Sequence, residues 1–200
     1  MRPSGYSTDA FTDLLFNALL GFTLLFFITI LFMNPIAKLG NATLKAEFII
    51  SVIWPEHRPD DVDVWVEDPN GQIVSYLRKD AGWLHLDRDD QGVVNDTIVI
   101  DGREVIHPIN QELVTIRGIV GGEYVVNLYN YANRSREPVP VTVRIEKVNP
   151  SLTTVFVDRV VLERENDELT VVRFTLAGDG ALVRMNRLPK TLTPYALEGG

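Results

Sequence analysis

The feature that most constrains this chain is an uninterrupted apolar run close to its amino terminus. Residues 14–33 contain no charged side chain, and the next charge along the chain is Lys38. In a helix, a run of this length extends about 30 Å, which is the thickness of the hydrocarbon core of a bilayer. The run therefore predicts a membrane-spanning helix, which we place at residues 10–36, and it disfavours a soluble single domain.

An uncleaved anchor explains the run better than a cleaved secretory signal does. The apolar part of a signal peptide is roughly 7–15 residues long and follows a cationic start. Here the run is longer, and the segment before it carries Asp9 and Asp13 against Arg2. No convincing cleavage site follows it. The positive charges near its two ends give only weak guidance on orientation.

Polar residues mark one face at the start of the predicted helix. Asp13, Asn17 and Gly21 are spaced by four residues, which places them along one side of a helix. A carboxylate at the edge of the hydrocarbon is costly, so Asp13 is a candidate functional residue, with Asn17 and Thr23 as supporting polar groups. Asp9 is interpreted instead as an interfacial residue in the first turn. The alternative that Asp13 is also only interfacial stays open.

Residues 11–16, FTDLLF, open this single span and resemble the ExbD/TolR/MotB class of small subunits of ion-driven motors. The resemblance covers residues 6–33. It implies a cytoplasmic amino terminus, one helix in the bacterial inner membrane and a periplasmic remainder. It also implies that Asp13 carries the transported H⁺ or Na⁺, with no other cofactor. The implied partners are a second copy of this chain, a multi-span ExbB/TolQ/MotA-like protein that forms a ring around the dimer, and an unidentified envelope target.

Beyond residue 42 the pattern changes to short apolar runs separated by turn residues. Val62, Val64 and Val66 recur at the period of a strand, and residues 68–71, DPNG, predict a tight turn after them. Seven or more such runs are typical of an antiparallel sandwich. We therefore expect an all-β fold of the jelly-roll or immunoglobulin-like type, followed by a C-terminal β-meander and preceded by one transmembrane α-helix.

The similarity of two segments to a known module supports this expectation. Residues 61–71 and 122–128 are similar to jelly-roll accessory modules of the pre-peptidase C-terminal type on secreted bacterial proteins, which implies a binding or spacer module without an active site. Within the meander, residues 152–162 and 169–176 are expected to pair as a hairpin. The expected domains are a cytoplasmic tail (1–9), a transmembrane helix (10–36), a periplasmic β-sandwich (37–148), a β-meander extension (149–187) and a flexible tail (188–200).

Composition and motifs exclude several classes of function. The chain has no cysteine, so disulfide scaffolds, thiolate metal sites and cysteine nucleophiles are excluded. Its formal net charge of −8 argues against nucleic acid as a partner, because phosphates require a basic surface. There is no glycine-rich nucleotide loop and no serine in a nucleophile elbow, and the histidines lack metal-ligand spacing. We do not expect an enzyme.

One acidic segment has part of the pattern of a calcium loop. Residues 87–92, DRDDQG, place oxygen donors at Asp87, Asp89 and Gln91 and a glycine at the sixth position. The position that closes such a loop with glutamate is occupied by Ile98. A solvated acidic turn is therefore the favoured interpretation, with a weak calcium site as the alternative.

Two hypotheses of function follow. In the first, the chain is a stator-type motor subunit that couples ion flow through Asp13 to movement of its periplasmic β domain. In the second, it is a membrane-tethered module that binds sugar or protein, its anchor is passive, and Asp13→Asn is silent. A second acidic cluster at residues 60–63 is interpreted under both as the entry of a strand.

Overall fold

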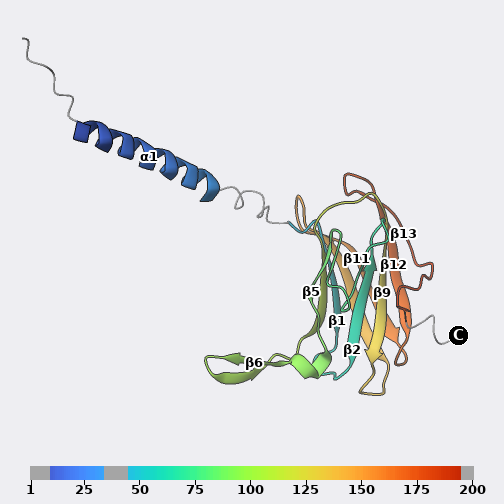
Figure 1. Cartoon of the computed structure of the whole chain (residues 1–200). Helices are drawn as coiled ribbons and strands as arrows, with labels where there is room; N and C mark the ends of the chain where they lie inside the picture. Colours follow the sequence, from blue (N-terminus) through green and yellow to red (C-terminus); the bar gives the residue numbers. More distant parts are fainter. Residues whose placement is uncertain (1–9, 34–44, 195–200) are drawn as a thin grey trace, which may run out of the picture. The chain divides into compact units, whose positions relative to one another are not determined.

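The computed structural model describes residues 10–33 and 45–194 of the chain. The chain divides into two compact units, Met1–Leu44 and Lys45–Gly200, which contain the helix and the strands respectively (Figure 1). The expected cytoplasmic tail (1–9), residues 34–36 of the expected span and residues 195–200 of the expected flexible tail (188–200) lie outside the described residues. Residues 188–194 of that tail are described, and Thr193 among them is buried.

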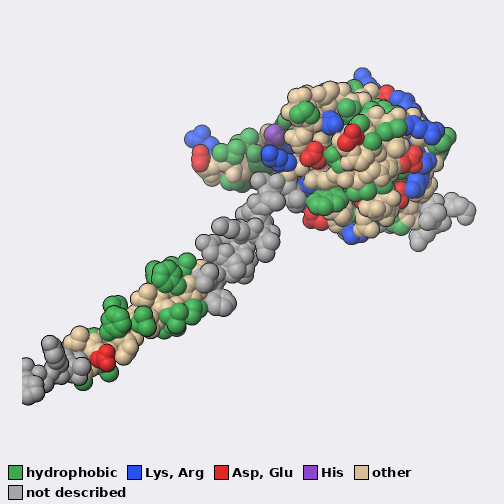
Figure 2. Space-filling view, turned by 90° about the horizontal axis from the view of Figure 1, so that it is seen from above, with side chains coloured by type: hydrophobic (Ala, Val, Ile, Leu, Met, Phe, Trp, Pro, Cys, Tyr) green, Lys and Arg blue, Asp and Glu red, His purple; other side chains and the backbone are tan. Residues whose placement is uncertain are grey.

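The first unit contains one long apolar helix, as expected. Helix α1 (Ala10–Met33) has 24 residues and a length of about 36 Å, and it is long and apolar enough to cross a membrane. Its side chains are exposed over residues 10–30. Hydrophobic side chains cover it in Figure 2, with an acidic side chain near one end. An exposed helix that is apolar all round is compatible with a membrane anchor.

The second unit is mostly β, with all pairings between its strands antiparallel. One six-stranded sheet contains, in spatial order, β11 (Thr153–Leu162), β10 (Val139–Lys147), β1 (Phe48–Trp54), β8 (Asn110–Ile116), β5 (Leu84–Arg88) and β4 (Asp80–Ala81). A five-stranded sheet contains β13 (Leu182–Asn186), β12 (Glu168–Leu176), β9 (Gly122–Ala132), β2 (Asp61–Glu67) and β3 (Ile73–Val74). A separate hairpin contains β6 (Thr97–Ile100) and β7 (Arg103–Ile106), preceded by a short 3₁₀ helix, η1 (Gly92–Asn95).

The two large sheets pack face to face around one core, which gives the expected β-sandwich (Figure 1). Alternate residues of β10 and β2 point into this core, among them Val141, Val143 and Val64. Near its centre the rings of Tyr124 and Phe174 stack with centroids 5.2 Å apart. Strand β1 lies in the interior of its sheet, between β10 and β8.

The expected hairpin between residues 152–162 and 169–176 is wrong. Strand β11 pairs with β10 in the six-stranded sheet, whereas β12 pairs with β9 in the other sheet. Each strand pairs with a long strand of its own sheet, and residues 163–167 cross from one sheet to the other. The expected pairing across the next turn is confirmed, because β12 does pair with β13. Strands after residue 149 are therefore integral parts of both sheets.

Candidate functional site

Helix α1 places Asp13 in its first turn, and Asp13 is the only charged residue of the helix. The helical backbone puts Asn17 and Gly21 on the same face, one and two turns further along. Thr23 has its own partner within the helix, because its hydroxyl donates to the Leu19 carbonyl at 2.8 Å. That hydroxyl can therefore face lipid without an unsatisfied donor.

The residues of the alternative calcium loop, Asp87, Asp89 and Gln91, do not all line one cavity. Asp87 lies in β5, where its carboxylate accepts a hydrogen bond from Arg117 Nη2 at 2.8 Å. Asp89 and Gln91, beyond the end of that strand, line a cavity of about 310 Å³ instead. The same cavity is lined by Asp61 of the second acidic cluster. Two acidic segments that are separate in the sequence thus meet at one cavity.

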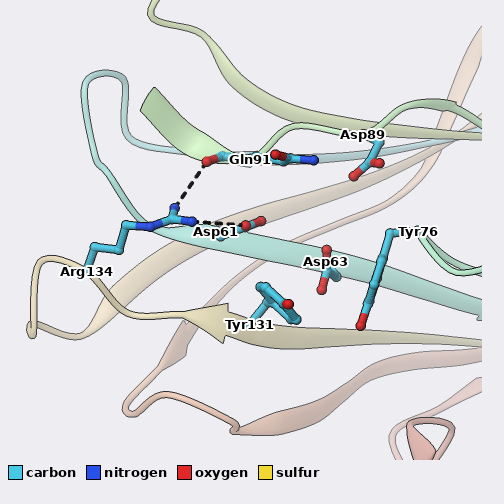
Figure 3. A pocket seen from close by; sticks show the side chains of 7 residues that line it. All are labelled: Asp61, Asp63, Tyr76, Asp89, Gln91, Tyr131 and Arg134. Carbon is cyan, nitrogen blue, oxygen red and sulfur yellow. Dashed lines mark hydrogen bonds and ion pairs between the residues drawn. The ribbon is translucent and has the colours of Figure 1, made fainter. Parts of the chain in front are cut away.

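The cavity lies beside the amino-terminal half of β2, at a place where that strand lacks a neighbour on one side (Figure 3). Strand β3 is only two residues long and pairs with Val66 and Glu67. Residues 61–65 of β2 are not paired with β3. The loop after β5, which contains Asp89 and Gln91, passes beside this part of β2. The lining residues are Asp61, Asp63, Tyr76, Asp89, Gln91, Tyr131 and Arg134.

Three carboxylates converge at this edge. Asp63, Asp89 and Glu112 each offer an oxygen, and these oxygens lie within 4.8 Å of one another. Asp63 is 3% exposed and Glu112 is 1% exposed, while Asp89 is partly exposed. Glu112 reaches across from β8 of the opposite sheet, where its Oε2 accepts a hydrogen bond from the Val64 backbone N–H. This hydrogen bond satisfies one backbone donor on the part of β2 that β3 does not cover.

The carboxylates of Asp63 and Glu112 are not fully satisfied by hydrogen bonds. Asp63 Oδ2 and Glu112 Oε1 are buried without a hydrogen-bond partner among the described residues. Burial, together with the charges of Asp61 and Asp89, raises the pKa of Asp63 to about 8. Burial and the charge of Asp63 also raise the pKa of Glu112 well above its ordinary value. Leaving charge here without a counter-ion is therefore unfavourable.

Arg134 closes one side of the cavity (Figure 3). Its Nη1 donates to the backbone carbonyls of Pro59 and Gln91 at 2.7 and 3.1 Å, and its Nη2 lies 3.5 Å from Asp61 Oδ2. Burial raises the pKa of Asp61 to about 6, and the guanidinium of Arg134 opposes this shift. The arginine thus compensates Asp61 and holds two neighbouring segments together.

Two tyrosines form another wall. The rings of Tyr76 and Tyr131 meet edge to face, with centroids 5.5 Å apart, and Tyr131 is 47% exposed. Carboxylates and tyrosines around an accessible cavity are suited to a cation, either a metal ion or a positively charged organic group.

Sequence reasoning missed Glu112, although one signal was present. Glu112 has the same strand phase as Val114 and Ile116, whose side chains are buried in the core. A charged residue at an inward position of a strand is unusual and indicates a special role.

Comparison of the chain with protein-family models, curated proteins and solved structures finds no significant match.

Proposed function

We propose that this protein is the small, stator-type subunit of an ion-driven membrane complex, in which Asp13 carries H⁺ or Na⁺. The observation that supports this most directly is the position of Asp13 as the only charge in a 24-residue apolar helix. A carboxylate at the edge of such a helix is costly unless protein or water surrounds it. A partner that supplies those surroundings would also supply an ion path.

The proposed assembly is a homodimer inside a ring of a multi-span ExbB/TolQ/MotA-like protein in the bacterial inner membrane. The amino terminus would be cytoplasmic, and the β-sandwich would be a periplasmic, jelly-roll-like module that transmits movement to an envelope target. Each elementary charge that crosses releases about 2.3 kcal/mol per 100 mV of membrane potential. Several ions together would supply the work of moving the sandwich, and no catalytic role is proposed.

The experiment isolates the full chain, carrying an affinity tag, from membranes of its native cells together with any multi-span protein that copurifies. The complex is placed in liposomes, and H⁺ and Na⁺ flux is measured under an imposed potential for the wild type, Asp13→Asn and Thr29→Val. Asp13→Asn keeps the size of the side chain but fixes it in a neutral form. Thr29→Val is the matched control, because the Thr29 hydroxyl donates to the Leu25 carbonyl of its own helix at 2.8 Å and is not one of the expected site residues.

The expected result is flux in the wild type and in Thr29→Val, and none in Asp13→Asn, with the partner retained in all three. Full flux in Asp13→Asn, or the absence of any multi-span partner, would overturn the proposal.

A second candidate function is a membrane-tethered binding module with a passive anchor. The carboxylate-lined cavity beside β2 supports this candidate, because a cavity of this kind can hold the ligand of a binding module. Under this candidate, Asp13→Asn is silent and variants at the cavity abolish function. Asp13→Asn, tested together with variants at the cavity, therefore distinguishes the two candidates.

A further inference from the structure

We infer that Asp63, Asp89 and Glu112 form a binding site for a divalent cation in the β-sandwich, and that this cation is Ca²⁺. The site goes beyond the proposed ion transport, because it lies in the other unit of the chain and would hold a resident ion. It also differs from the calcium loop that the sequence suggests, since only Asp89 belongs to both.

The first argument is the geometry of the donor atoms. Ca²⁺ binds its oxygen ligands at about 2.3–2.6 Å, so ligands on opposite sides of the ion are separated by up to about 5 Å. The three carboxylate oxygens lie within 4.8 Å of one another, which allows all three to contact one ion. Asp61 and Gln91 line the same cavity and offer further oxygens.

The second argument is independent of the clustering. Two oxygens, Glu112 Oε1 and Asp63 Oδ2, are buried and have no hydrogen-bond partner among the described residues. Both side chains are more than nine-tenths buried, so bulk water does not compensate them. The Val64 N–H holds the other oxygen of Glu112 and so fixes the carboxylate at this place. A bound cation would satisfy the two remaining oxygens.

The balance of charge favours a divalent ion. Four carboxylates lie at the cavity and beside it, on Asp61, Asp63, Asp89 and Glu112. Two cationic side chains face them: Arg134 lies beside Asp61, and Lys79 Nζ lies 2.9 Å from Asp89 Oδ2. With all four ionised, two negative charges remain, which one divalent ion neutralises.

The choice of Ca²⁺ over Mg²⁺ follows from the number of protein oxygens. Mg²⁺ keeps several of its waters and usually binds through one or two carboxylates, whereas Ca²⁺ accepts six to eight oxygens in flexible geometry. A site with three converging carboxylates, a fourth carboxylate nearby and an amide oxygen in the same cavity is typical of Ca²⁺.

The test uses the full chain in detergent micelles after treatment with a chelator and its removal. Calorimetric titration with Ca²⁺ gives stoichiometry and affinity, and Mg²⁺ is titrated separately. Tb³⁺, which substitutes for Ca²⁺, gives a local signal because the Tyr76 and Tyr131 rings line the cavity and can sensitise its emission. The variants are Asp63→Asn, Glu112→Gln and, as the matched control, Asp87→Asn, whose carboxylate bonds to Arg117 instead.

The expected result is one Ca²⁺ per chain, Mg²⁺ binding at least tenfold weaker, and a rise in Tm on adding Ca²⁺. Asp63→Asn and Glu112→Gln should each weaken Ca²⁺ binding at least tenfold and lose the Tb³⁺ signal, while Asp87→Asn keeps both. Circular dichroism identifies any variant that fails to fold, in which case the variant that folds and the wild-type titration decide. No stoichiometric Ca²⁺ in the wild type, equal affinity for Mg²⁺, or loss of binding only in Asp87→Asn would overturn the inference.

Discussion

The carboxylates of Asp63 and Glu112 in the β-sandwich are buried, whereas Asp13 in α1 is exposed in the structure, so the surroundings of these acids have different origins. In the sandwich, the chain itself removes the carboxylates from water and fixes them, through β2, β8 and the Val64 N–H. In α1 the side chains are exposed over residues 10–30, so the described structure does not bury Asp13 in the same way. A fold can therefore define the chemistry of its own buried acids, whereas under the proposed function the surroundings of Asp13 come from lipid or a partner.

The same contrast predicts that the two units depend differently on the rest of the chain. A fragment of residues 45–200 should fold, whereas the chain shortened to residues 1–148 should lose its β structure entirely. The shortened chain lacks β11 and β12, which belong to different sheets, and with them core residues such as Phe174 and Leu176. Far-UV circular dichroism with thermal melting measures both outcomes. A cooperative β melt from residues 1–148 would show that the sandwich does not need its last strands.

Removing one aromatic ring from each unit should also give unequal effects. Phe174 is 1% exposed and stacks on Tyr124, so Phe174→Ala should lower the free energy of unfolding of the sandwich by about 3–5 kcal/mol. Phe26, which is 62% exposed in α1, is the matched control, and Phe26→Ala should leave this free energy unchanged. Urea titration of the full chain in detergent, followed by tryptophan fluorescence, measures it. Similar losses in both variants would contradict the separation of the two units.

The buried acids predict an unusual dependence of stability on pH. Folding raises the pKa of Asp63 from 3.8 to about 8. It raises the pKa of Asp61 from 3.8 to about 6. Between these values the folded chain binds more protons, so stability falls as the pH rises from about 4 to about 8. The groups that face Asp63 are Asp61, Asp89 and Glu112, with Arg134 beside Asp61.

With a chelator present, the loss over this range should be several kcal/mol, with the larger share from Asp63 because its pKa shift is the larger of the two. Asp63→Asn cannot ionise and should remove most of it, while added Ca²⁺ should restore stability at pH 8. Thermal melts at unit intervals of pH, with Asp87→Asn as the control, measure these effects. A profile that is flat with the wild type and the chelator would show that the acids are not held as the structure describes.

The smallest effect is expected in a third region, the β6–β7 hairpin. All eight residues of its strands are exposed, including Val99 and Ile106, and the two strands pair only with each other. Replacing residues 97–106 by two glycines should change the free energy of unfolding of the sandwich by less than about 0.5 kcal/mol. Urea titration measures this as well, and a loss above about 2 kcal/mol would mean that the hairpin supports the sandwich.

Local features of the fold could be predicted from the sequence, whereas relations between distant segments could not. The uncharged run predicts α1, and the alternation at Val62 to Val66 predicts β2. Strand β7 was missed, although Asp101 and Gly102 between β6 and β7 form a tight turn with positive φ at both residues, which is typical of a hairpin. The sequence alone does not distinguish a turn that pairs two strands from one that crosses between sheets, so β11 and β12 were paired wrongly.

The candidate site divides in the same way. The sequence shows two acidic segments, one with Asp89 and Gln91 and the other at residues 60–63. No pattern in the sequence predicts that the two segments line the same cavity. That contact depends on how the two sheets face each other and on the short β3, which leaves part of β2 uncovered. Glu112 reaches the same place from the opposite sheet, and only its inward strand phase indicates it.

The interior position of β1 has a mechanical consequence. The chain enters the sandwich through this strand, which pairs with β8 at seven residue pairs and with β10 at six. A pull on the amino-terminal side would load both rows of hydrogen bonds in shear, so that many bonds would have to break together. Strand β13, by contrast, lies at a sheet edge with one neighbour, and its bonds would open one after another. Tension applied through α1 would thus be borne by a strand with a neighbour on each side, while tension applied from the carboxyl end would peel the sandwich from its edge.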